Sequence, residues 1–151
     1  MAEGRVVAIY ITPDHRALPQ PVERARAHAG KGLEGNRYFF EGGAPAGNAL
    51  TLIAAEAVEA FTKETGIAFS GQESRRNVVT RGIDLNALVG KRFRVGEVAC
   101  VGVELCEPCS HLASMTHAEV LRGLVHRAGL NADIVTDGEI AVGDPVVEYR
   151  R

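Results

Sequence analysis

Short runs of β-branched residues separated by glycine turns recur along this chain, and this pattern limits its fold more than any other feature. The plainest case is a pair of β-prone runs, Lys91 to Val95 and Val98 to Leu105, joined by Gly96-Glu97. A two-residue connection with glycine first is typical of a β-hairpin. The sequence therefore predicts two antiparallel strands in this region.

Further elements can be placed ahead of the hairpin. β-branched residues predict a strand from Arg5 to Ile11. Ala49 to Ile53 predicts another strand, which leads into a helix from Ala54 to Thr65 with apolar residues at helical spacing, ended by Gly66. Leu18 to Ala29 suits either a strand or a short helix, and periodicity does not decide between them.

The C-terminal third combines one helix with several short strands. A Thr-x-x-Glu capping box at Thr116 predicts the start of a helix, and Gly129 predicts its end. Short β-prone runs with glycine turns follow between Ala132 and Tyr149. Many short strands and two helices favour a mainly β chain with a few helices, folded as a β-barrel, over a doubly wound α/β sheet.

Composition narrows the class of protein further. A chain of 151 residues, 46% of them hydrophobic, is expected to form a single domain spanning residues 1–151. A formal net charge of -2 provides no general attraction to nucleic acid or to an anionic membrane, so neither is expected as a partner. Three cysteines and no signal-like N-terminus indicate a reducing, cytoplasmic setting, and no apolar stretch is long enough to span a membrane.

Cys106 and Cys109 have the C-x-x-C spacing that suits metal, redox or persulfide chemistry, and spacing alone does not choose among these. Because Pro108 sets a turn before Cys109, we expect Cys109 to be presented to solvent and Cys106 to pack against the strand. Cys100, within the hairpin, is expected to be structural. His111 and His117 lie near the motif, and His111 is a candidate for activating the thiolate. A zinc site would draw on both histidines together with Cys100, Cys106 and Cys109.

A second candidate site is the run Ser74-Arg75-Arg76-Asn77, which places two guanidinium groups and an amide together. The planar fork of arginine suits phosphate or carboxylate, so this run is either an anion clamp or a solvated charged turn. A glycine-rich loop from Gly30 to Arg37 is a candidate functional loop. The cations that could join a basic rim are Lys31, Arg37, Lys91, Arg92 and Arg94.

Together these motifs resemble the MOSC family, named for the C-terminal domain of molybdenum cofactor sulfurase. The resemblance runs from about Val6 to Val147. It rests on motifs in the same order as in the family: the glycine loop Gly30 to Arg37, the run Arg75 to Leu85, Glu107-Pro108-Cys109, and Gly129 to Ala132 followed by Gly143-Asp144-Pro145.

The resemblance implies a β-rich barrel and a chemistry centred on Cys109, as a ligand of molybdenum or as a persulfide sulfur carrier. It implies that a molybdopterin cofactor would be bound by the two stretches Gly35-Asn36-Arg37 and Arg75-Arg76-Asn77. Asn36 stands where the family usually has an aspartate; it keeps an acceptor oxygen and loses the charge. A role in loop geometry is therefore expected to survive better than a role that needs a carboxylate.

The leading hypothesis is thus a molybdenum-cofactor-binding protein that acts in sulfur transfer or in the reduction of N-hydroxylated substrates, with a cysteine desulfurase or a reductase as its expected partner. Two alternatives stay open: a non-enzymatic cofactor carrier or interaction module, and a small structural zinc protein. Pyridoxal phosphate is not expected, because the chain is too short to hold the desulfurase domain that binds it in the sulfurase.

Overall fold

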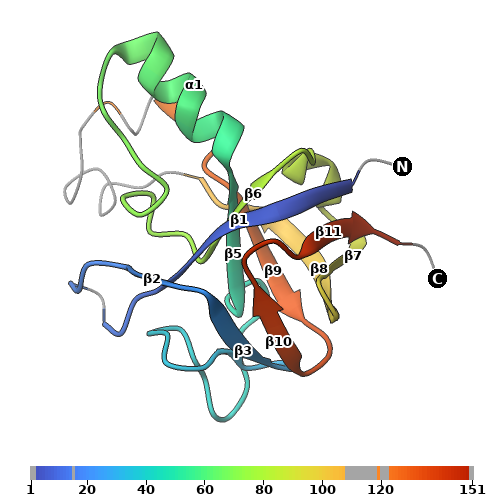
Figure 1. Ribbon diagram of the computed structural model, residues 1–151. Coiled ribbons are helices and arrows are strands. Elements are labelled where there is room, and N and C mark those ends of the chain that lie inside the picture. The colour runs from blue at the N-terminus through green and yellow to red at the C-terminus, as the bar shows by residue number, and fades with distance from the viewer. Residues whose placement is uncertain (1–2, 15, 108–118, 120–122, 150–151) are drawn as a thin grey trace.

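The computed structural model describes residues 3–14, 16–107, 119 and 123–149. Within these residues, seven strands form a closed barrel (Figure 1). Their order is β11-β7-β8-β9-β5-β6-β1, and pairing of β11 with β1 closes the ring. The predicted mainly β barrel is therefore confirmed. The strands are β1 (Glu3–Ile11), β5 (Leu50–Ala54), β6 (Val78–Arg81), β7 (Arg92–Val95), β8 (Val98–Leu105), β9 (Leu130–Ile134) and β11 (Pro145–Glu148).

The β7–β8 hairpin has the predicted boundaries and turn. Val95 pairs with Val98, and Gly96 takes a positive φ of 59° in the turn between them. Positive φ is readily available to glycine, which explains why the turn needs that residue. Val98 and Cys100 of β8 belong to the barrel core, whereas Val101 on the other face is only partly buried.

The segment left undecided between strand and helix forms two strands. β2 (Gln20–Val22) pairs with β1, and β3 (Arg24–His28) lies between β4 (Gly32–Leu33) and β10 (Gly138–Ala141) in a second, three-stranded sheet. Along β3 the arginines are exposed and the alanines are buried. This period of two is the strand pattern, and it becomes decisive only once β10 supplies a partner.

Helix α1 (Ala55–Thr65) confirms the predicted helix and its stop. It connects β5 to β6, which pair in parallel and so need a crossover. Its buried residues include Val58 and Phe61, which pack outside the barrel with Phe69. Gly66 ends the helix in the left-handed conformation, and its N–H donates to the carbonyl of Thr62.

One short 3-10 helix completes the described elements. η1 (Leu85–Leu88) is a 3-10 turn that buries both of its leucines. The helix predicted from Thr116 falls mainly outside the described residues. Its predicted end at Gly129 is wrong, because residues 124–128 form turns and a bend ahead of β9. No helix among the residues described has the length and apolar character needed to cross a membrane.

Thr80 on β6 tests how much a buried hydroxyl without a partner lowers the stability of the fold. Its side chain is 0% exposed, and its hydroxyl has no hydrogen-bond partner among the described residues. Burying a hydroxyl without a partner opposes folding, and valine has nearly the same shape. We expect Thr80→Val to raise the free energy of unfolding by about 1 kcal/mol. Urea unfolding would show a higher midpoint with an unchanged slope; a lower midpoint would mean that the hydroxyl is bonded in solution.

Candidate functional site

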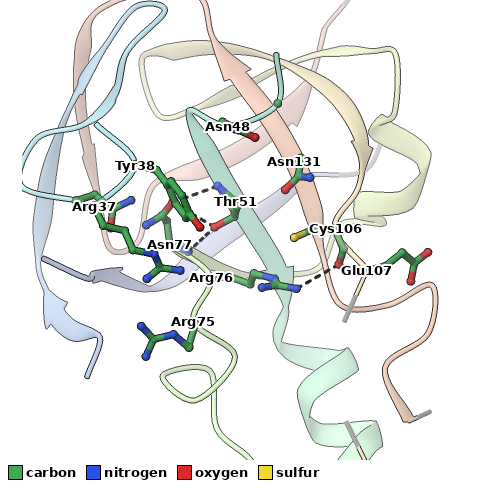
Figure 2. A pocket seen from close by; sticks show the side chains of 12 residues that line it. Arg37, Tyr38, Asn48, Thr51, Arg75, Arg76, Asn77, Cys106, Glu107 and Asn131 are labelled. Carbon is green, nitrogen blue, oxygen red and sulfur yellow. Dashed lines mark hydrogen bonds between the residues drawn. The ribbon is translucent and has the colours of Figure 1, made fainter. Parts of the chain in front are cut away.

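One pocket gathers most of the residues that the motifs had singled out. It has a volume of about 240 Å³ and lies where β5, the end of β8 and the start of β9 meet the loops at 36–38 and 75–77 (Figure 2). It therefore brings together segments that are far apart in the sequence. The described lining residues are Asn36, Arg37, Tyr38, Gly47, Asn48, Thr51, Arg75, Arg76, Asn77, Cys106, Glu107 and Asn131.

Backbone conformation explains how two consecutive arginines reach the same pocket. Neighbouring side chains on an extended segment point to opposite sides, but Arg75 has a φ of 62°, which breaks that alternation. Ser74 supports the turn: its hydroxyl donates to the carbonyl of Gly71 at 2.6 Å and accepts the N–H of Arg76 at 3.3 Å. Both Arg75 and Arg76 are buried, at 8% and 9% exposure, so the solvated-turn interpretation of this run is wrong.

Arg37 and Arg75 concentrate positive charge at one end of the pocket. The guanidinium of Arg37 lies 4.7 Å from the ring centre of Tyr38, and its Nε is buried with no hydrogen-bond partner among the described residues. Arg75 donates to the carbonyl of Ala17 at 2.9 Å. Burial lowers the pKa of Arg75, and the nearby charge of Arg37 lowers it further. Two guanidinium groups held close together make a site that an anion would stabilise.

Arg76 uses its guanidinium to hold the main chain at the other end. Its Nε donates to the carbonyl of Ala128 at 2.8 Å, and its Nη2 donates to the carbonyl of Cys106 at 3.3 Å. The N–H of Cys106 in turn donates to the carbonyl of Gly129 at 2.8 Å. Arg76 thus joins the end of β8 to the start of β9, in addition to lining the pocket.

The two cysteines that the structure describes occupy different environments. Cys106 is half-buried in the pocket wall, and Figure 2 shows its sulfur directed toward the pocket interior. Cys106 therefore lines the pocket instead of packing against the strand as expected, because the chain has left β8 at Leu105. Cys100 is fully buried in the barrel core, as expected, and burial raises the pKa of its thiol to about 12. Cys109 lies outside the described residues.

The sequence model of the MOSC domain family matches residues 25–147 of the chain. This chain belongs to the MOSC domain family. Comparison with curated proteins found no match.

Solved structures with the same MOSC fold are distant in sequence. The YuaD protein from Bacillus subtilis is 16% identical with a TM-score of 0.79, and the comparison covers 99% of this chain and 100% of that one. YiiM from Geobacillus stearothermophilus is 16% identical with a TM-score of 0.78, covering 98% and 76%. YiiM from Escherichia coli is 18% identical with a TM-score of 0.72, covering 97% and 70%. At these identities the comparison establishes the fold.

Within this MOSC domain, the two predicted cofactor-binding asparagines are engaged in holding the pocket together. Asn36 accepts the N–H of Thr12 at 2.9 Å, which is a role in loop geometry that needs no carboxylate. The side-chain oxygen of Asn77 accepts from the N–H and the hydroxyl of Thr51, both at 3.2 Å, and its amide donates to the carbonyl of Tyr10 at 3.2 Å. Asn36 therefore ties its loop to the end of β1, and Asn77 ties its loop to β5 and to β1.

Several predicted residues lie away from the pocket of the MOSC domain. Gly35 has a φ of 84° and forms the turn before Asn36, but it is not among the described lining residues. The described lining also lacks the other members of the expected basic rim, Lys31, Lys91, Arg92 and Arg94. Arg92 and Arg94 are exposed on β7 because the strand alternation points Phe93 and Val95 into the core.

Cys100, one of the ligands expected for a zinc site, is not available to bind a metal ion. Cys100 is sealed inside the barrel core of the MOSC domain, with a pKa of about 12 that keeps its thiol protonated. Among the described residues, no group of three His, Cys, Asp or Glu side chains is placed to hold a metal ion. Of the other expected ligands, Cys106 lines the pocket, and Cys109, His111 and His117 lie outside the residues that the structure describes.

The sequence motifs did not single out three polar residues that line this MOSC pocket. Asn131 and Glu107 lie inside the motifs of the MOSC resemblance, but neither side chain was singled out. Asn48 directly follows a glycine-rich stretch from Gly42 to Gly47. Glu107 binds His126 through both carboxylate oxygens, at 2.7 Å each. The hydrogen bond from the backbone N–H of His126 lowers the pKa of Glu107, and the ring of His126 lowers it further. Only the position of Glu107 within the C-x-x-C motif could have signalled it.

Proposed function

We propose that this chain binds the molybdenum cofactor, a phosphorylated sulfur-rich pterin, in the arginine-lined pocket. The MOSC family as a whole is linked to this cofactor. The observation that carries the proposal is the convergence of Arg37 and Arg75 on one end of the pocket, where the buried Nε of Arg37 has no hydrogen-bond partner among the described residues. A phosphate oxygen would accept from that N–H and offset the positive charge.

The remaining lining residues fit such a group. Asn48 and Asn131 offer side-chain amides that can donate to and accept from the polar edge of a pterin ring. Cys106 adds a thiol, a soft ligand that suits a sulfur-rich transition-metal centre. Glu107 is the single carboxylate among the described lining residues, and its oxygens are held by His126. Arg37 and Arg75 would hold the phosphate, and the two asparagines would orient the ring.

Cys109, three residues after Cys106, is proposed as the molybdenum ligand or the persulfide sulfur carrier. When bound, the cofactor supplies a metal centre that exchanges electrons with a substrate or accepts a sulfur ligand. The chain's own residues bind its phosphate and orient its ring. The reaction is proposed to be either sulfur transfer or the reduction of an N-hydroxylated substrate, with a desulfurase or a reductase as partner.

The binding proposal is tested by purifying the chain from a host that makes the cofactor. We expect molybdenum and pterin in near-equal amounts, measured by elemental analysis and by fluorescence after oxidative release. Intact mass distinguishes the two roles of Cys109, because a persulfide adds the mass of one sulfur atom whereas a bound metal does not survive denaturation. Protein that carries neither molybdenum nor pterin, and does not retain cofactor added afterwards, would refute the proposal.

A carrier that performs no catalysis is the second candidate, and one observation favours it. Glu107, the single carboxylate among the described lining residues, is occupied by His126, so this part of the pocket offers no available acid or base. The isolated cofactor-loaded protein would then hold the cofactor without turnover. Reduction of an N-hydroxylated base by the loaded protein, with dithionite as electron donor, would reject this candidate.

A further inference from the structure

The edge of the pocket formed by Cys106 and Glu107 is held from two sides. On the inner side, Cys106 donates to the carbonyl of Gly129 at 2.8 Å and accepts from Arg76 at 3.3 Å. On the outer side, the carboxylate of Glu107 reaches His126, which is not among the described lining residues. The inner contacts belong to the barrel ends, whereas the outer contact joins the side chain of Glu107 to the backbone N–H and the ring of His126.

His126 has an unusual geometry for this contact. It takes a φ of 62°, which is uncommon for a residue other than glycine. In this conformation its backbone N–H donates to Oε1 of Glu107 and its ring Nδ1 lies against Oε2, both at 2.7 Å. Because a carboxylate accepts only, Nδ1 carries the hydrogen. The carbonyl of His126 accepts from the side chain of Asn86 at 2.8 Å, which fixes the residue to η1.

Such a conformation persists only where the surrounding contacts determine it. The ring of His126 is 75% exposed, so burial of apolar surface does not explain it. A simple exposed ion pair would form without a left-handed backbone. The positive φ belongs to a turn in which the N–H of Arg127 donates to the carbonyl of Leu124 at 3.0 Å, with His126 as the third residue. This turn directs both the N–H and the ring of His126 at one carboxylate.

We propose that His126 is a positioning residue for the pocket: by holding both oxygens of Glu107, it keeps the end of β8 and the thiol of Cys106 in place against the arginines. This inference concerns the same pocket and rests on the proposed function for its biological consequence. The contacts that it invokes exist in the chain without any ligand. Nothing in the sequence motifs assigns a role to His126.

The test measures how fast iodoacetamide alkylates Cys106 in the protein without cofactor, followed by peptide mapping. We expect His126→Ala to raise the rate at Cys106 by about two- to fivefold, because the pocket edge opens more often when the exposed hydrogen bond from the ring to Glu107 is lost. Glu107→Ala should have at least as large an effect, because it also removes the acceptor of the backbone N–H of residue 126. His126→Asn should restore most of the protection, since asparagine tolerates a positive φ and places a donor near the position of Nδ1.

Three controls separate positioning from general loss of structure. Cys100 lies in the core, and its alkylation reports unfolding, so its rate should stay low in every variant. His28→Ala removes a similar histidine–glutamate pair, with Glu34 at 2.9 Å, from the second sheet and should leave Cys106 unchanged. In the double variant of His126 and Glu107, the rate should equal that of Glu107→Ala alone, because the histidine acts through the glutamate.

The proposal is overturned if His126→Ala leaves the rate at Cys106 unchanged, or if the double variant shows the product of the two single effects. A parallel rise at Cys100 would also overturn it, because His126 would then serve global stability. None of these outcomes depends on cofactor, so they are distinct from failure of the proposed function. That failure would appear as absence of molybdenum and pterin from the unaltered chain.

Discussion

Gly129→Ala is expected to lower the free energy of unfolding by about 3–5 kcal/mol, at the upper end of what a single substitution does. Gly129 leads into β9, where Leu130 pairs with Leu52 of β5. A Cβ at this position would overlap the carbonyl oxygen of Leu52, which is backbone and cannot rotate away. The φ of 123° adds strain, because it is a conformation that residues with a side chain rarely adopt. The β5–β9 pairing would have to separate.

The matched control is Gly66→Ala at the end of α1. Gly66 also has a positive φ, 74°, but nothing lies within 4 Å of a Cβ placed there. Only the backbone strain should remain, at about 1–2 kcal/mol. Urea unfolding of both variants measures the difference. Equal destabilisation would show that strain, rather than the close approach of two backbones, is the reason for glycine at position 129.

The double substitution Arg37→Gln with Arg75→Gln is expected to reduce affinity for the cofactor by roughly 100-fold. A hydrogen bond between a charged donor and a phosphate contributes about 1.5–3 kcal/mol, and this variant removes the charge from both guanidinium groups. Titration with a phosphorylated pterin, followed by calorimetry, measures the loss directly. Retention of molybdenum and pterin by the purified variant measures the same loss in the loaded protein.

Arg94→Gln is the control for charge alone. Arg94 lies on β7, packs 4.4 Å from the ring centre of Tyr149 and is absent from the described pocket lining. Its substitution changes the net charge without touching the site, so affinity should stay within about twofold. If the double variant binds as tightly as the unaltered chain, the phosphate does not bind at Arg37 and Arg75. If Arg94→Gln weakens binding equally, the attraction is a property of the whole surface.

Local sequence patterns predicted most of the elements. The β7–β8 hairpin, α1 and its stop at Gly66 follow from relations between residues no more than a few positions apart. Such patterns report what a segment prefers by itself. The sequence does not decide between strand and helix at β3, because its period of two becomes meaningful only through pairing with β10, more than a hundred residues away.

The candidate site was predicted in composition but not in arrangement. The motifs singled out Arg75, Arg76 and Asn77, and all three line the pocket. Their individual tasks were not predictable, because they depend on atoms contributed by other segments. Asn77 bonds to Tyr10, 67 positions earlier, and Arg76 bonds to Cys106, 30 positions later. The predicted position of Cys106 was wrong for the same reason, because the pocket wall that it joins is made by residues distant in the sequence.

The sequence by itself therefore determined the class of fold, the hairpin, the helix and the basic character of the site, because periodicity, turn residues and charge are local properties of the chain. Only the tertiary structure decided that Arg37 and Arg75 meet, that Arg76 holds the main chain, and that His126 holds Glu107. Closure of the barrel sets these distances. Long-range pairing of strands selects which side chains become neighbours, and no short segment carries that information.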